Sequence, residues 1–311
     1  MEPASFKASA PGSIMLLGEH SVLQGSRALC TAVNRRATVL LRRQPERRIS
    51  IESALGQMET SLDNPEYNGK FDFILRAVAR ISDRIEHGIA IEIETEMPAT
   101  VGLGSSAAVT VAACAAARAL AGLDSSPGLV MDDAVSVVRA VQGKASGADC
   151  AASAWGGAVG YRVDPFECVP LDKDYPLTLV YCGYKRKTAD VIEMVARRRR
   201  RFPEGFNKLD ELVGLTVSEG LAAFSEGNWQ RLGFLMDFNH GLMESMGVAN
   251  RDLARSVHIL RSQDGVLGAK ISGSGLGDCA VALGKPSDDV DLGGERIDIG
   301  IDRKGVVVEE A

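Results

Sequence analysis

Residues 98–108 read Pro-Ala-Thr-Val-Gly-Leu-Gly-Ser-Ser-Ala-Ala, a glycine-containing turn that leads into a run of helix formers. Gly102 and Gly104 allow the backbone to take positive φ and to approach a ligand closely. Ser105 and Ser106 fall at the predicted helix start, where their hydroxyls can cap free N–H groups. Because a helix start carries unpaired donors and the positive end of the dipole, the segment predicts a phosphate-binding loop.

This segment alone leaves a second interpretation open. It contains neither of the phosphate-binding patterns GxxxxGK[ST] and GxGxxG. Glycine turns before capped helices are also common where no phosphate binds. The choice between the two interpretations depends on the rest of the chain.

The flanking sequence alternates between helical and strand patterns. Apolar residues recur at helical spacing from Phe71 to Ile85, whereas Ile89, Ile91 and Ile93 alternate with other residues, as in a half-buried strand. The expected fold class is therefore mixed α/β (α+β). Further helices are predicted at 105–121, 132–141, 207–224, 229–246 and 251–261, and further strands at 177–182, 268–272 and 279–283.

Length and composition indicate a globular protein of more than one domain. The chain has 311 residues, of which 45% are hydrophobic and 24% charged. This length is large for one core, so we expect two domains, 1–168 and 169–311, divided where Pro165 and Pro170 interrupt the pattern.

Charge, hydropathy and cysteine spacing argue against several classes of protein. A formal net charge of -6 gives no reason to expect nucleic-acid binding. The most apolar stretch, 107–121, is interrupted by Arg118 and falls short of a membrane span. The six cysteines form no CxxC pair, which argues against structural zinc and fits reduced thiols. We expect a cytoplasmic protein with neither a nucleic-acid nor a membrane partner.

Two further segments carry candidate site residues. Residues 10–25 read Ala-Pro-Gly-Ser-Ile-Met-Leu-Leu-Gly-Glu-His-Ser-Val-Leu-Gln-Gly, which places Glu19 and His20 at the end of a short apolar strand, where they can line a cleft. Residues 268–283 read Gly-Ala-Lys-Ile-Ser-Gly-Ser-Gly-Leu-Gly-Asp-Cys-Ala-Val-Ala-Leu, a glycine-rich loop whose amides can bind an anion. A structural histidine and a plain hairpin turn are the alternatives.

The order and spacing of the three segments resemble the motifs of the GHMP kinases, named after galactokinase, homoserine kinase, mevalonate kinase and phosphomevalonate kinase. The resemblance covers roughly the whole chain. It implies two α/β domains with the active site in the cleft between them, and ATP and Mg²⁺ as cofactors. It assigns Pro98, Gly102, Leu103, Gly104, Ser105, Ser106 and Ala107 to the nucleotide, with Ser106 as the ligand of Mg²⁺.

Within the family the chain is most similar to the mevalonate kinases. Glu19-His20 followed by Ser-Val-Leu-Gln-Gly carries this similarity, as does the segment 143–157. By this resemblance the enzyme transfers the γ-phosphoryl of ATP to a hydroxyl of mevalonate, a hydroxy acid of isoprenoid precursor synthesis, and Asp149 is the catalytic base. The implied substrate-binding residues are Glu19, His20, Ser146, Thr188, Gly273, Ser274 and Gly275.

One departure from the family pattern concerns a cation. The family has a lysine after the opening Ala-Pro-Gly, close to the catalytic aspartate, and this chain has Ser13. An active enzyme needs another cation there, because charge is valuable beside a transferring phosphoryl group. Lys144 is the nearest lysine in sequence to Asp149 and is predicted to be catalytic, with Lys185 and Lys187 as alternatives.

Other departures keep alternative functions open. Val138 stands where the family has a glutamate that binds Mg²⁺, and Gln142 replaces a histidine. Asp278 replaces a glycine of mevalonate kinases and favours phosphomevalonate as acceptor. The run Arg197–Arg201 either binds an anion or forms a solvated helix end. A silent relative that binds ligand without catalysis is the second class, and a homodimer is among the assemblies that the sequence leaves open.

Overall fold

The computed structural model describes residues 5–98, 100–173 and 175–311, so Ala99 of the glycine turn lies outside the described residues. The strands are β1 (Ser5–Leu17), β2 (Ala28–Gln44), β3 (Arg48–Ser53), β4 (Gly56–Ser61), β5 (Gly88–Thr95), β6 (Ala158–Arg162), β7 (Glu167–Leu171), β8 (Leu177–Tyr181), β9 (Val266–Ser272), β10 (Cys279–Gly284), β11 (Glu295–Ile299) and β12 (Val307–Glu310). The helices are α1 (Asp72–Ala79), α2 (Ser105–Leu120), α3 (Pro127–Gln142), α4 (Ala148–Trp155), α5 (Thr188–Arg201), α6 (Pro203–Glu226), α7 (Trp229–Met246) and α8 (Arg251–Arg261), with 3₁₀ turns at Ser21–Gln24 and Ser82–Arg84.

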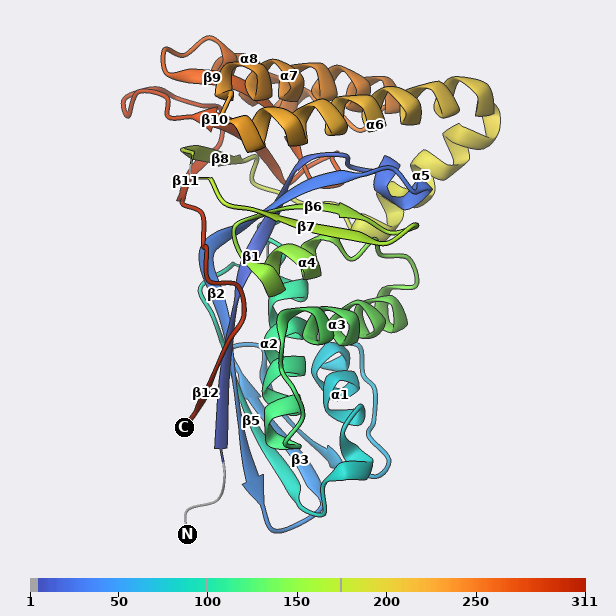
Figure 1. Ribbon diagram of the computed structural model, residues 1–311, viewed down its shortest axis with the longest axis vertical. Coiled ribbons are helices and arrows are strands. Elements are labelled where there is room, and N and C mark those ends of the chain that lie inside the picture. Colours follow the sequence, from blue (N-terminus) through green and yellow to red (C-terminus); the bar gives the residue numbers. More distant parts are fainter. Residues whose placement is uncertain (1–4, 99, 174) are drawn as a thin grey trace.

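The larger sheet runs in the order β12-β1-β2-β5-β3-β4, and β6 and β7 extend it from one end of β2. Helices α1 to α4 lie on one side of this sheet, where α2 and α4 pack against its strands and α1 and α3 pack against α2 (Figure 1). The alternation in β5 confirms the predicted strand, because Ile89 and Ile91 are buried while Glu94 is exposed. The helical stripe that begins at Phe71 ends sooner than its spacing suggests, since α1 stops at Ala79 and a 3₁₀ turn follows.

The smaller antiparallel sheet runs in the order β11-β8-β10-β9 and carries α7 and α8 on one face (Figure 1). Its central strands, β8 and β10, are buried throughout. Glycine and asparagine set the turns between the covering helices. Gly227 ends α6 in the left-handed conformation, and the Asn228 side chain then caps α7; Gly247 and Asn250 do the same between α7 and α8. The predicted helices 229–246 and 251–261 are confirmed.

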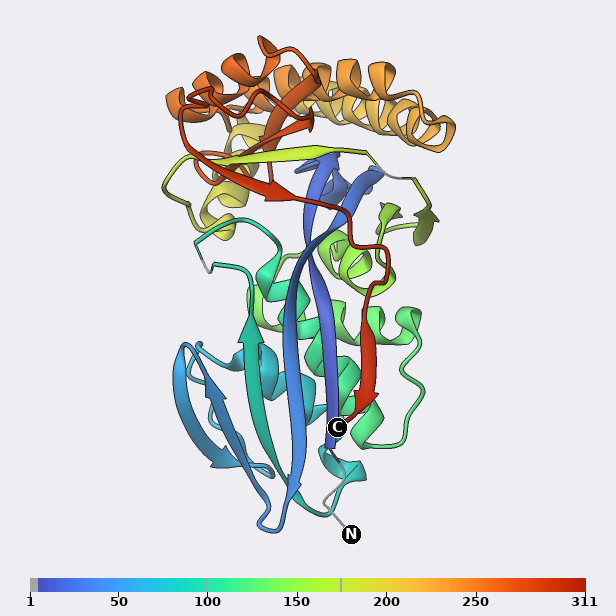
Figure 2. The same cartoon turned by 90° about the vertical axis from the view of Figure 1, so that its left-hand side faces the viewer.

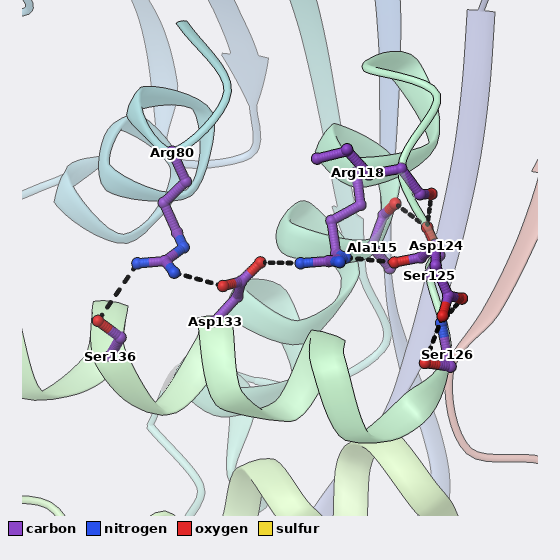
Figure 3. A network of polar contacts seen from close by, with 9 residues as sticks. Arg80, Ala115, Arg118, Asp124, Ser125, Ser126, Asp133 and Ser136 are labelled. Atoms are coloured by element: carbon purple, nitrogen blue, oxygen red, sulfur yellow. Dashed lines mark hydrogen bonds and ion pairs between the residues drawn. The ribbon is translucent and has the colours of Figure 1, made fainter. Parts of the chain in front are cut away.

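One carboxylate joins three helices of the larger sheet. Asp133 of α3 accepts hydrogen bonds from Arg80, which follows α1, and from Arg118 of α2 (Figure 3). The Arg118 Nε also donates to the carbonyl of Asp124, in the turn between α2 and α3. Because α2 is held at this end, its opposite end presents a fixed N-terminus to the site described below.

The two ends of the described chain meet in the larger sheet. Strand β12 pairs antiparallel with β1, with Phe6 opposite Glu310 (Figure 2). The predicted division at residue 168 falls within β7 and remains a prediction. Among the described residues no helix is both long and apolar enough to span a membrane.

Candidate active site

A cavity of about 230 Å³ lies where the larger sheet and its helices meet the loop between β9 and β10. Most residues predicted for the site line it. The lining includes Glu19, His20, Gly102, Gly104, Ser105, Ser106, Ala107, Lys144, Ser146, Asp149, Thr188, Gly273 and Ser274.

Three predicted site residues do not line this cavity. Leu103 is buried, and its carbonyl accepts a 2.8 Å hydrogen bond from the amide of Ser13 in β1. Gly275 lies against Val248, and Pro98 is exposed. Leu103 therefore fixes the glycine turn to the sheet, which is a structural role in forming the loop.

The start of α2 is open to a ligand. Gly104 stands at the N-cap in the left-handed conformation, with φ of 65°, and the helix begins at Ser105. Having no side chain, Gly104 caps nothing, and the hydroxyls of Ser105 and Ser106 make no hydrogen bond with the described residues. The prediction that these hydroxyls cap the helix is therefore wrong. The amides of 104–107 precede the first helical bond, from Ala108 to Gly104, and are left for an anion.

Replacing Gly104 with valine should weaken ATP binding at least tenfold, about 1.4 kcal/mol. A Cβ at this position would lie 2.2 Å from the Ser13 Oγ, and the positive φ is unfavourable for a β-branched residue. Gly122→Val is the matched control, because Gly122 follows the other end of α2 with φ of 67° and has open space around it. Calorimetry with ATP, and thermal unfolding of both variants, separate binding from strain. Unchanged ATP affinity in folded Gly104→Val would contradict the predicted assignment of this loop to the nucleotide.

Asp149 is placed at the first turn of α4, a helix that was not predicted. Its Oδ1 accepts a 2.9 Å hydrogen bond from the Ser13 hydroxyl, and the Cys30 thiol lies 3.8 Å away. Burial raises the pKa of Asp149, while the Ser13 hydrogen bond, the charge of Lys185 and the Cys30 contact oppose this shift. A carboxylate with a raised pKa at the wall of a cavity is suited to accept a proton.

Glu19 takes part in a fully buried ion pair that the sequence did not reveal. Its carboxylate pairs with the ammonium of Lys270 in β9 and accepts a 3.3 Å hydrogen bond from Asn239 in α7. The exposed fractions of the Glu19 and Lys270 side chains are 2% and 0%. Burial raises the pKa of Glu19 and lowers the pKa of Lys270, and each charge opposes the shift of the other. Both carboxylate oxygens of Glu19 therefore have partners. Because Glu19 follows β1 and Lys270 lies in β9, this ion pair connects the two sheets.

His20 follows this pair directly and reaches the cavity. Its backbone is left-handed, with φ of 61°, an uncommon conformation outside glycine. The Nε2 atom lies 3.0 Å from the carbonyl of Ser274 in the β9–β10 loop. Burial lowers the pKa of His20, which favours the neutral ring. The buried Glu19–Lys270 pair thus fixes the segment that aims His20 at the cavity.

The β9–β10 loop brings Asp278 to the glycine turn. Asp278 Oδ1 accepts a 2.6 Å hydrogen bond from the Gly102 amide, and Lys185 pairs with its Oδ2 at 3.2 Å. The only sign of this arrangement in the sequence is the departure from the family glycine at 278. Val138, which stands where the family has a glutamate, also lines the cavity, so the side chain at this position is apolar.

The arginine run forms the end of α5. Arg198 donates to the carbonyl of Met246, Arg199 pairs with Asp210, and Arg200 pairs with Glu193. The run contributes no residue to the lining of the cavity. These contacts agree with the interpretation of a helix end and lend no support to an anion site.

Comparison with known proteins agrees with this architecture. Family models described as GHMP kinases N terminal domain and GHMP kinases C terminal match residues 72–157 and 221–298, and a galactokinase galactose-binding signature matches residues 2–43. A mevalonate kinase of Pyrococcus furiosus is 32% identical, with 97% of this chain and 98% of the relative covered. A mevalonate kinase of Methanothermobacter thermautotrophicus is 36% identical, over 88% and 89%. A crystal structure of L. major mevalonate kinase in complex with R-mevalonate is 27% identical, covers 95% of each chain and superposes with a TM-score of 0.76.

The chain belongs to the GHMP kinase family. It is accordingly an ATP-dependent kinase whose acceptor is an alcohol. The predicted fold class, a mixed α/β GHMP kinase fold, is confirmed.

Proposed function

We propose that this enzyme transfers the γ-phosphoryl group of ATP to a hydroxyl of mevalonate. One observation carries the proposal: Asp149 and the open start of α2 line the same cavity, in a chain whose relatives of 32% and 36% identity are named mevalonate kinase. A base and a phosphate-binding helix start are the two parts that positioning a hydroxyl against a phosphoryl group requires.

In this reaction the residues that line the cavity would have different roles. The amides at the start of α2 would hold the phosphates of ATP. Asp149 would accept the proton of the acceptor hydroxyl while the oxygen of that hydroxyl bonds to the γ-phosphorus. The bond between the γ-phosphorus and the bridging oxygen would break, and ADP would leave. His20 and Thr188, which both line the cavity, would orient the acceptor acid.

The residues present fit Mg²⁺, which binds oxygen atoms and keeps several waters. The Ser106 hydroxyl faces the cavity without a hydrogen-bond partner among the described residues and would be the protein ligand. Bound Mg²⁺ would supply positive charge to the β- and γ-phosphate oxygens. Few protein ligands are required, so Val138 in place of a glutamate is compatible with activity.

Phosphomevalonate is the second candidate acceptor. Lys144 and Lys185 line the cavity, and either ammonium could meet a phosphate on the acceptor. The galactose-binding signature adds galactose to the acceptors that need testing.

An assay of ATP consumption against mevalonate, phosphomevalonate, homoserine and galactose tests these alternatives. We expect turnover only with an acceptor present, the highest kcat/KM with mevalonate, and loss of activity when EDTA removes Mg²⁺. A preference of tenfold or more for phosphomevalonate, about 1.4 kcal/mol, would replace the proposed acceptor. ATP binding without turnover on any of the four acceptors would contradict the proposed transfer to mevalonate.

A further inference from the structure

A lysine and a carboxylate meet at the edge of the phosphate-binding turn. Lys185, in the loop between β8 and α5, places its Nζ 3.2 Å from Oδ2 of Asp278. The other oxygen of this carboxylate accepts the 2.6 Å hydrogen bond from the Gly102 amide. Asp149 and Lys185 line the same cavity. The ammonium is thus held beside the turn in a space that it shares with Asp149.

Backbone bonds fix the two loops to each other. The amide of Asp278 donates to the carbonyl of Tyr184 at 2.7 Å, and the amide of Cys182 donates to the carbonyl of Asp278 at 2.9 Å. These bonds continue the pairing of β8 with β10, in which Cys279 lies opposite Tyr181. The position of Lys185 is therefore set by the smaller sheet, although the turn that it reaches belongs to the larger one.

The Lys185 ammonium has hydrogen-bond donors left for a ligand. A lysine has three donors, and within the described part of the chain Lys185 forms an ion pair with Asp278 alone. Its side chain is 33% exposed and lines the cavity. Lys144 also lines the cavity but pairs with no described carboxylate, so nothing holds its ammonium at a defined place. Of the two lysines, Lys185 is the one with a fixed position.

We propose that Lys185 is the cation that stabilises the transferring phosphoryl group, and that Asp278 is a positioning residue that holds it beside the phosphate-binding turn. This proposal rests on the kinase activity of the proposed function but does not depend on which alcohol is the acceptor. Positive charge fixed in advance at the site of developing negative charge lowers the barrier to transfer.

The charges around Asp149 agree with this placement. Ser13 from β1 and Cys30 from β2 face its carboxylate, and Cys150 is its neighbour in α4. The positive charge of Lys185 opposes the rise that burial causes in the pKa of Asp149. Lys185 thereby also helps to keep the base ionised.

The test compares kinetics of the full chain with single and double variants. Lys185→Met should lower kcat at least tenfold, about 1.4 kcal/mol, with a smaller change in KM, and Lys185→Arg should recover part of the loss. Asp278→Asn keeps an oxygen for the Gly102 amide but loses the charge that holds the ammonium, so kcat should fall. In the Lys185→Met background Asp278→Asn should have little further effect, because a positioning residue acts through the residue that it holds.

Arg186→Met is the matched control, since it removes one positive charge from the same loop. Its kcat should remain within about twofold of the wild type, a change of under 0.5 kcal/mol. A kcat within twofold for Lys185→Met would overturn the proposal. Additive losses in the double variant would overturn the positioning role of Asp278.

A second measurement separates this proposal from the proposed function. In ¹³C-carboxyl NMR titrations, with the Asp149 signal assigned from Asp149→Asn, the pKa of Asp149 should rise in Lys185→Met and stay unchanged in Arg186→Met. If the wild type turns over no acceptor, the proposed function fails and the titration still decides where the ammonium lies. An unchanged Asp149 pKa in Lys185→Met would overturn its placement.

Discussion

Replacing Asp149 with asparagine should lower kcat by about two to four orders of magnitude while leaving ATP affinity unchanged, the usual effect of losing a positioned base. Asparagine has nearly the same shape, and its carbonyl oxygen can still accept the hydrogen bond from Ser13. The variant therefore isolates charge and proton acceptance from geometry. Steady-state kinetics with the best acceptor, together with calorimetry for ATP, measures both quantities.

The pH profile adds a second readout for Asp149. Burial raises the pKa of Asp149, and a general base works in its deprotonated form, so wild-type kcat/KM should fall as the pH drops through this raised pKa. The asparagine variant should lack that limb. Asp190→Asn is the control, since Asp190 occupies the first turn of α5 outside the cavity lining and should leave kcat unchanged. A near-wild-type kcat for Asp149→Asn would reduce Asp149 to a structural residue.

Replacing Lys270 with methionine should destabilise the protein by roughly 3–5 kcal/mol, because it leaves the Glu19 carboxylate buried without its partner. Free energies of unfolding from urea titrations give this value. Without Lys270 the pKa of Glu19 in the folded state should lie further above its unfolded value. Stability from such a group is present below the unfolded pKa and is lost as the pH rises, so the destabilisation should shrink as the pH falls toward 4–5.

Two variants control for this effect. Lys208→Met removes an exposed lysine that pairs with Glu211, and should cost less than about 1 kcal/mol. Glu19→Gln combined with Lys270→Met should recover much of the lost stability, because no buried charge then lacks a partner. If Lys270→Met lowers the free energy of unfolding no more than Lys208→Met does, the Glu19–Lys270 pair does not hold the two sheets together.

The sequence predicted those helices and strands whose own residues show the apolar spacing of a helix or strand. Helices 229–246 and 251–261 have apolar spacing, and the structure has the same bounds, with Gly247 directly after the first helix as its C-cap. The hairpin of β3 and β4 was not predicted, although Ile49 and Ile51 alternate with polar residues, because β4 itself is almost wholly polar. Its pairing with β3 supplies the order that its own sequence does not indicate.

The candidate site was predictable where a motif carries its own chemistry, and not where distant residues meet. The turn at Gly102 and Gly104 could be recognised from the sequence, and the structure places both residues at the cavity. Glu19 and Lys270 are 251 positions apart, and no local pattern indicates that they pair. Closeness in sequence drew attention to Lys144, whereas Lys185 is brought to Asp278 by the pairing of β8 with β10.

The pairing of β12 with β1 joins the last strand of the described chain to the first, and this order has a consequence for synthesis. Residues 307–310 are synthesised only after the smaller sheet, so the outer edge of β1 at residues 6–9 lacks this neighbour while the rest of the larger sheet can already form. A strand edge without a neighbour can pair with other nascent chains. Stop codons that remove 307–310 should therefore yield a protein that aggregates at this edge, even though every cavity-lining residue has been translated.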